Sequence, residues 1–306
     1  MSTHQTEMEQ RMYPTIHSGR DFLANIPGGV YGLLMFMNAG LVVDVGAAAG
    51  GSTCTVKKYS PASRVIAFEP FPGNWPYFKE NTKELSNVTF HRVALADSHG
   101  KMSFFVPATV SGTEKSWEKM IGYSSGGRLV VGALENDPRT IQVDVFTLDE
   151  IVKDHIRLVK LDVQGGERGV MKGAQNLLEA DKIDMIYTEF SGDEELLTTL
   201  IEYDFIVFDD EYIVSPRTAD ADLTEWDIIK PIALSSGATA YRVWPRVYPR
   251  HPDEYARWLA NKRPEIRAVQ TDLLCVKRRF LPEVLMSASR SLQIQAREQI
   301  VPGIGG

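Results

Sequence analysis

Few cysteines and no long unbroken apolar run set the first limits on this sequence. Its 306 residues include two cysteines, Cys54 and Cys275, which lack the spacing of a metal or redox site, so we expect buried free thiols. The longest apolar stretch, residues 30–45, is interrupted by glycines, Asn38 and Asp44, so it cannot span a bilayer. The polar start, MSTHQTEMEQ, does not resemble a signal peptide. Together these features predict a cytoplasmic protein without a membrane span.

An excess of positive charge is also missing. Lysine and arginine total 33 against 40 acidic residues, which gives a net charge of −7. No overall positive field would draw the protein to phosphate backbones, and this argues against a nucleic-acid substrate. A hydrophobic share of 43% is typical of a globular protein with a real core.

From residue 41 onward, short β-branched runs alternate with helical patterns. This alternation predicts an α/β protein with a Rossmann-like, doubly wound sheet of seven strands, most of them parallel. The expected strands are residues 41–45, 64–68, 88–93, 156–161, 183–188, 205–208 and 272–277. The expected helices are residues 52–59, 74–85, 166–180 and 194–202.

The remaining segments complete the predicted organisation. Residues 1–40 are expected to form an N-terminal helical extension, and residues 281–306 a C-terminal tail, around one domain at 41–280. Two stretches interrupt the alternation of predicted strands and helices. Residues 107–140 are expected to be a loop, and residues 211–270 an insertion before the last strand. An irregular stretch of the second kind is usually functional.

The first motif is LVVDVGAAAGGST at residues 41–53. An apolar strand runs into Gly46 and Gly50 and then into a helix. Glycine allows backbone to turn tightly or to lie against a ligand, and the first helix amides can then bind polar groups. The D-x-G-x-x-x-G spacing differs from the dinucleotide fingerprint, and no Lys-Ser/Thr ending for a triphosphate follows. Alone, the motif is also compatible with a tight turn that binds nothing.

The second motif, RVIAFEP at residues 64–70, ends an apolar strand on Glu69. Doubly wound folds place an acidic residue here that binds ribose hydroxyls, since a carboxylate accepts two hydroxyl donors at once. The alternative is a helix-capping or salt-bridged surface glutamate. Turn and acid together predict a cofactor that contains a nucleoside.

The third motif is IRLVKLDVQGGERGVMKGAQNLL at residues 156–178. It predicts a strand with Lys160 and Asp162 at its end, a glycine turn, and a helix whose Val170 and Met171 face inward. Asp162 would lie near the crevice in which such folds bind ligands. Its alternative role is to cap the next helix.

These segments together resemble the FkbM-like family of class I S-adenosylmethionine-dependent methyltransferases. The family pattern is D-x-G-A-N-x-G, a strand ending E-P, then L-D, then K-I-D-V-E-G-x-E-x-x-V-L-x-G-A. The matching segments here are DVGAAAG at 44–50, FEP at 68–70, TLDEI at 147–151 and KLDVQGGERGVMKGA at 160–174. The resemblance extends roughly over residues 41–280.

The resemblance implies S-adenosylmethionine as methyl donor and usually an O-methyl product. The implied cofactor-binding residues are Asp44, Gly46, Ala47 and Gly50 at the methionine end, Glu69 at the ribose, Ala94, Leu95 and Asp97 at the adenine, and Asp162. Two positions depart from the pattern: Ala48 replaces the usual Asn, and Gln164 replaces the usual Glu. These departures leave the catalytic details less defined than the choice of cofactor.

A hydroxyl acceptor must lose a proton, which requires a base or a metal ion. The catalytic candidates are Asp162 and Glu189, expected on the same rim of the sheet, together with Lys160. The two carboxylates could hold a divalent cation, or one could be a base that the other orients. No spacing typical of a metal site supports the first option, so no metal ligand is assigned.

The segment 211–270 is expected to shape the acceptor pocket, with Trp244, Arg246 and Tyr248 as substrate-binding residues. Aromatic faces suit an apolar or sugar ring, and arginine suits an anionic group. The alternative is that these residues pack a homo-oligomer interface or simply cover the sheet. The predicted partner is a small-molecule acceptor such as a sugar or natural-product intermediate.

Three other functions remain open at this point. An NAD(P)-dependent oxidoreductase or nucleotide-sugar enzyme predicts a three-glycine fingerprint and a Tyr-x-x-x-Lys pair, and neither is evident. A binding protein that kept the fold without its chemistry is compatible with Ala48 and Gln164. A nucleic-acid methyltransferase would favour an Asn/Asp-Pro-Pro-Tyr/Phe element for a flipped base, which is absent.

Overall fold

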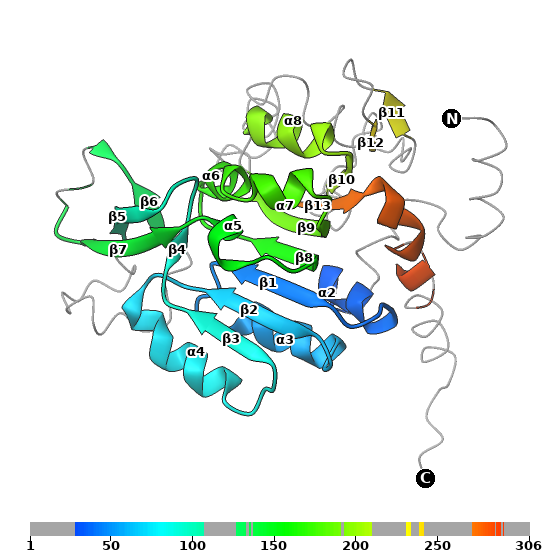
Figure 1. The fold of residues 1–306 in the computed structure, drawn as a ribbon. Coiled ribbons are helices and arrows are strands. Elements are labelled where there is room, and N and C mark those ends of the chain that lie inside the picture. Colours follow the sequence, from blue (N-terminus) through cyan, green and yellow to red (C-terminus); the bar gives the residue numbers. More distant parts are fainter. Residues whose placement is uncertain are drawn as a thin grey trace, which may run out of the picture.

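A seven-stranded sheet forms the centre of the protein (Figure 1). The computed structural model describes residues 28–106, 127–132, 135, 137–190, 193–209, 231–233, 239–241, 271–284, 286–288 and 290. The strands, in their order across the sheet, are β10 (Phe205–Asp209), β13 (Thr271–Lys277), β9 (Ile183–Phe190), β8 (Ile156–Leu161), β1 (Leu41–Val45), β2 (Arg64–Phe68) and β3 (Val88–His91). β13 runs antiparallel to both of its neighbours, and the other pairs are parallel. The predicted doubly wound α/β fold is confirmed.

Helices cover both faces of this sheet and make three layers (Figure 1). The helices are α2 (Val30–Leu33), α3 (Gly51–Tyr59), α4 (Trp75–Thr82), α5 (Leu148–Ile151), α6 (Glu167–Lys172), α7 (Gln175–Glu179) and α8 (Glu194–Glu202). Short 3₁₀ turns lie at η2 (Leu34–Phe36), η3 (Pro72–Asn74) and η7 (Arg278–Phe280). Since strand side chains alternate between faces, the strands supply two apolar clusters. One packs against α5–α8, and the other against α2 and residues 280, 281, 284 and 288.

The helix predicted at 166–180 is instead two helices, α6 and α7. They part at Gly173, where an added Cβ would lie 2.1 Å from the carbonyl oxygen of Ala96. The start of α7 is fixed by Asp149, whose carboxylate accepts the amide protons of Asn176 (2.7 Å) and Leu177 (3.0 Å). A close approach and a side-chain cap, both from distant segments, therefore decide this break.

A second, four-stranded sheet lies beside the first (Figure 1). Its strands are β4 (Ala94–Leu95), β7 (Thr140–Phe146), β5 (Gly100–Phe105) and β6 (Arg128–Val130), in that order. The loop predicted at 107–140 was wrong in part, because β6 pairs antiparallel with β5. Alternating burial along β7 puts Val143 and Val145 into a small core with Phe71.

The segments at the two ends of the described chain pack on one face of the large sheet. Leu33 and Leu34 share a cluster with Phe280 and Val284, and the Ser287 hydroxyl donates to the Leu33 carbonyl. Residues 30–37, 280–284 and 286–288 thus belong to the same core as the strands. The domain limits at 40 and 280 stay a prediction.

Three further expectations concern single features. Both cysteines are free, but only Cys275 is fully buried, and Cys54 is half-buried. No helix in the described part of the chain is long and apolar enough to cross a membrane. Of the insertion at 211–270, the structure describes β11 (Pro231–Ala233) and β12 (Thr239–Tyr241), which pair antiparallel. Trp244, Arg246 and Tyr248 lie outside the described residues.

Candidate active site

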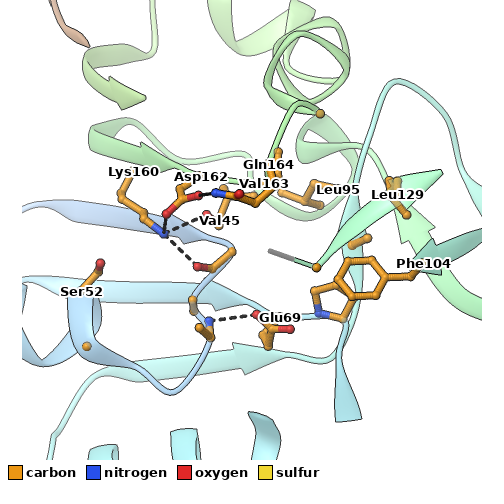
Figure 2. A pocket seen from close by; sticks show the side chains of 18 residues that line it. Val45, Ser52, Glu69, Leu95, Phe104, Leu129, Lys160, Asp162, Val163 and Gln164 are labelled. Atoms are coloured by element: carbon orange, nitrogen blue, oxygen red, sulfur yellow. Dashed lines mark hydrogen bonds and ion pairs between the residues drawn. The ribbon is translucent and has the colours of Figure 1, made fainter. Parts of the chain in front are cut away.

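A pocket of about 230 Å³ opens where β1, β2 and β8 end (Figure 2). The carboxyl ends of parallel strands are where doubly wound folds bind ligands. Four segments supply the wall: the turn after β1, the first residues of α3, the end of β2 and the loop after β8. The small sheet closes one side with Phe104 and Leu129. From left to right, Figure 2 shows Ser52, then Glu69, then Leu129.

The turn after β1 depends on Gly46. Its φ is 76°, and a Cβ there would lie 1.9 Å from the carbonyl oxygen of Asp162, so only glycine fits. The amide groups of Gly46 and Ala47 both donate to the Phe68 carbonyl, at 3.0 and 2.9 Å. Ala48 has φ 46°, a left-handed conformation that Asn adopts more readily than Ala. The turn therefore holds β1 against β2 and presents its backbone to the pocket.

Glu69 is buried at the end of β2, with 4% of its surface exposed. Its two carboxylate oxygens accept the amide protons of Ala48 (2.9 Å) and Phe71 (2.8 Å). Burial raises its pKa to about 7, against the opposing effect of these amides and of Lys160. The Asn74 side chain donates a third hydrogen bond to this carboxylate. A carboxylate has about four acceptor positions, so Glu69 can still accept a hydroxyl donor from the pocket that it lines. Glu69 is not the surface glutamate that the alternative interpretation required.

Asp44 and Lys160 form the floor behind the turn. They are neighbours in register on β1 and β8, and Asp44 is fully buried. The Lys160 ammonium donates to the Gly46 carbonyl at 2.8 Å and lies 3.7 Å from Asp44 and 3.5 Å from Asp162. The other Asp44 oxygen accepts from the Thr53 hydroxyl at 2.7 Å. Lys160 thus joins two carboxylates to the turn, and Asp44 fastens α3 to β1.

Gln164 brings the two predicted catalytic carboxylates together. Its side-chain amide donates to Asp162 Oδ1 at 2.8 Å and to Glu189 Oε2 at 2.9 Å. The prediction that Asp162 and Glu189 share one rim of the sheet is confirmed. Helix α6 has no side-chain cap, so Asp162 does not cap it; instead, the Glu167 carboxylate accepts amide protons from the turn before it.

Glu189 differs from Asp162 in its electrostatic surroundings. Its half-buried position raises its pKa to about 7, and the nearby carboxylates of Asp162, Glu167 and Asp272 add to this, while Gln164 opposes it. A carboxyl group with such a pKa can take up and release a proton at neutral pH.

Of the residues proposed from the sequence, seven line the pocket: Gly46, Ala47, Glu69, Ala94, Leu95, Lys160 and Asp162. Four do not. Asp44 and Gly50 support the turn from behind, Asp97 is exposed after β4, and Glu189 reaches the pocket wall through Gln164. The sequence reasoning missed Ser52, Phe104 and Leu129 as lining residues. The described residues contain no cluster of three or more metal-ligating side chains.

Comparison with known proteins matches this chain to methyltransferases. The sequence model of the "Methyltransferase FkbM domain" matches residues 44–207, which is more than half of the chain. "Methyltransferase 1" of Beauveria bassiana is 26% identical over 185 residues, covering 56% of this chain and 74% of the relative. "Hexuronic acid methyltransferase AglP" of Haloferax volcanii is 25% identical over 186 residues, covering 58% and 70%.

Among solved structures, a methyltransferase FkbM from Methylobacillus flagellatus aligns with a TM-score of 0.38 and 17% identity, over 56% of this chain and 41% of that one. The family match spans all four segments that form the wall of the pocket: the turn after β1, the first residues of α3, the end of β2 and the loop after β8. The chain belongs to the FkbM methyltransferase family.

Proposed function

We propose that this protein transfers the methyl group of S-adenosylmethionine to a hydroxyl group of a small molecule. The observation that carries the proposal is Glu69: a buried carboxylate at the end of β2 that two backbone amides and the Asn74 side chain hold in place, with an acceptor position left for a ribose hydroxyl. No lysine with P-loop spacing follows the turn, and the three-glycine dinucleotide fingerprint is absent.

The pocket suits the three parts of this cofactor. Ala94, Leu95, Phe104 and Leu129 offer an apolar wall for the adenine ring. Glu69 would accept the ribose hydroxyls. The turn at Gly46 and the first residues of α3 would hold the methionine end, because helix amides at an N-terminus favour a carboxylate.

The cofactor supplies an activated methyl group, and the protein must align the acceptor and take its proton. Glu189 is the proposed base, since its pKa lies near neutral pH. Asp162 is held by Lys160 and Gln164. It orients Glu189 through the side-chain amide of Gln164, which bridges the two carboxylates. A divalent cation at Asp162 and Glu189 has no support in the described residues beyond the two carboxylates themselves.

A sugar-like or other small polar acceptor is the proposed substrate. The name of the Haloferax volcanii relative, a hexuronic acid methyltransferase, supports a sugar acceptor here. Trp244, Arg246 and Tyr248 remain the proposed acceptor-binding residues. Cytoplasmic location, the lack of a nucleic-acid partner and homo-oligomer formation stay predictions of the sequence.

The test begins with binding. S-adenosylhomocysteine should raise the melting temperature of the protein, whereas NAD should not. Glu69→Gln, which keeps the side-chain shape, and Glu69→Ala should each weaken binding about tenfold or more, since a charged acceptor is lost. Glu80→Ala, an exposed glutamate on α4, is the matched control and should bind normally. Unchanged affinity in both Glu69 variants would disprove the ribose assignment.

A further inference from the structure

The first described helix precedes the family match and places one side chain against a residue that lines the pocket. Tyr31 lies on α2, and its phenol donates a hydrogen bond of 3.1 Å to the Ser52 hydroxyl. Ser52 is the second residue of α3 and lines the pocket at the end opposite the small sheet (Figure 2). Since the family match begins at residue 44, Tyr31 is an addition from outside it.

The position of the Tyr31 ring is fixed by a second tyrosine. Tyr187 on β9 meets it edge-on, with the ring centroids 6.1 Å apart and the planes at 80°. The Tyr187 hydroxyl donates in turn to Asp272 at 3.3 Å. Burial and the nearby carboxylate of Asp44 raise the pKa of Tyr31 well above its usual range. The Tyr31 phenol therefore keeps its proton at neutral pH, and it donates that proton to Ser52.

The donor direction of Tyr31 decides what Ser52 can do. A serine hydroxyl has one proton and two lone pairs. Because Tyr31 donates to Ser52, the Ser52 proton is not used in that bond and is free to be donated elsewhere. Ser52 also stands in the first turn of α3, a helix of nine residues whose first amides have no acceptor within the helix. An anion at this end of the pocket would meet both the hydroxyl and these amides.

We infer that Tyr31 is a positioning residue that aims the Ser52 hydroxyl proton at the carboxylate of the cofactor's methionine moiety. The inference rests on the proposed function, because it requires S-adenosylmethionine in this pocket. It makes α2 part of the donor site and gives the segment before the family match a role beyond covering the sheet. Tyr31 does not touch the reacting atoms, so its effect falls on binding of the donor and not on the chemical step.

The experiment is a double-mutant cycle read by calorimetric titration with S-adenosylhomocysteine. Tyr31→Phe keeps the ring and its contact with Tyr187, and Ser52→Ala removes the hydroxyl itself. Each should raise the Kd about three- to tenfold, as expected for one lost hydrogen bond. The double variant should bind no more weakly than Ser52→Ala, since Tyr31 acts only through that hydroxyl. The KM for S-adenosylmethionine should rise in Tyr31→Phe with kcat unchanged.

Tyr59→Phe is the matched control. Tyr59 ends the same helix, and its ring lies against Gly28, away from the pocket. This variant should bind like the unmodified protein.

Wild-type affinity in Tyr31→Phe, or losses that multiply in the double variant, would overturn the inference while leaving the proposed function intact. A lower melting temperature with unchanged Kd would overturn it as well, because it would reduce Tyr31 to packing. If the unmodified protein does not bind S-adenosylhomocysteine, the proposed function fails first.

Discussion

At the scale of single residues, the carboxylates at the ends of the strands have different hydrogen-bond and ion-pair partners. These partners indicate a different role for each carboxylate. Asp44 is fully buried beside the Lys160 ammonium, so its charge is used to hold the turn. Asp162 shares the same ammonium. Glu69 and Glu189 each have a pKa that burial raises to about 7. The first has both oxygens on backbone amides, which leaves Glu189 as the group suited to move a proton.

Glu189→Gln should therefore lower kcat by about 10²–10⁴-fold while the fold persists, because a positioned base is lost. In the unmodified enzyme, kcat should rise as the pH goes from 6 to 8, since the base must be deprotonated to accept a proton. The pH profile and single-turnover rates measure both effects. Glu202→Gln, exposed on α8, is the control. Full activity of Glu189→Gln would remove Glu189 from the mechanism.

The same pKa has a consequence for stability. A folded-state pKa of about 7, above the usual value near 4.5, means that the folded protein holds a proton that the unfolded chain has released. The contribution of Glu189 to stability is then present below pH 4.5 and is lost as the pH rises through 7. Urea unfolding should show Glu189→Gln gaining stability relative to the unmodified protein as the pH is raised from 5 to 8.

Ala48 is the second residue with a distinct expectation. Its φ of 46° is costly for alanine and is better tolerated by asparagine. Ala48→Asn should therefore stabilise the protein by roughly 0.5–1 kcal/mol, which is a rise of about 1–4 °C in melting temperature for a domain of this size. Asn87, exposed with φ 59°, offers the reverse control. Asn87→Ala should lower the melting temperature by a similar amount, and a loss of stability in Ala48→Asn would contradict the strain argument.

At the scale of elements, local sequence patterns predicted the strands and strand ends that depend on local sequence. All seven strands of the large sheet overlap the strands predicted from runs of apolar residues. The ends of β2 and β8 place Glu69 and Asp162 as expected. The break between α6 and α7 was not predicted, since it depends on Gly173 meeting a carbonyl from another segment. β6 was missed because it has three residues and pairs with β5 across a long stretch of sequence. β7 was not predicted either, although polar and apolar residues alternate along TIQVDVF.

The missed small sheet carries an expectation of its own. Leu129 on β6 lines the pocket where the adenine ring is proposed to lie. Leu129→Ala should weaken binding of S-adenosylhomocysteine by roughly 1 kcal/mol, about fivefold, through lost apolar contact. Val131→Ala, which truncates a side chain with 75% of its surface exposed just after β6, should leave the Kd unchanged. Calorimetry compares the two, and equal Kd values in both variants would place the adenine elsewhere.

At the scale of the whole molecule, the family match ends before the sheet is complete. It reaches residue 207, whereas β13 inserts later between β9 and β10. Because β13 is antiparallel to β10, the end of β10 at Asp209 and the start of β13 at Thr271 lie on the same edge of the sheet. Asp272 is the register neighbour of Glu189, so that edge is the one that carries the proposed base.

The segment between β10 and β13 is therefore anchored at both ends beside the site, which supports its proposed role in binding the acceptor. Trp244→Ala and Arg246→Ala should reduce methyl transfer to the acceptor at least tenfold while the Kd for S-adenosylhomocysteine stays constant. Methyl transfer against a panel of neutral and acidic sugars measures the first quantity, calorimetry the second, and light scattering the oligomeric mass. If the segment instead packs a subunit interface, the mass should fall while the preference among acceptors is retained.

Arg246→Ala also tests the charge of the acceptor. If Arg246 pairs with a carboxylate of the acceptor, its loss should lower turnover of acidic sugars more than of neutral ones, because only the acidic acceptor loses a charged partner.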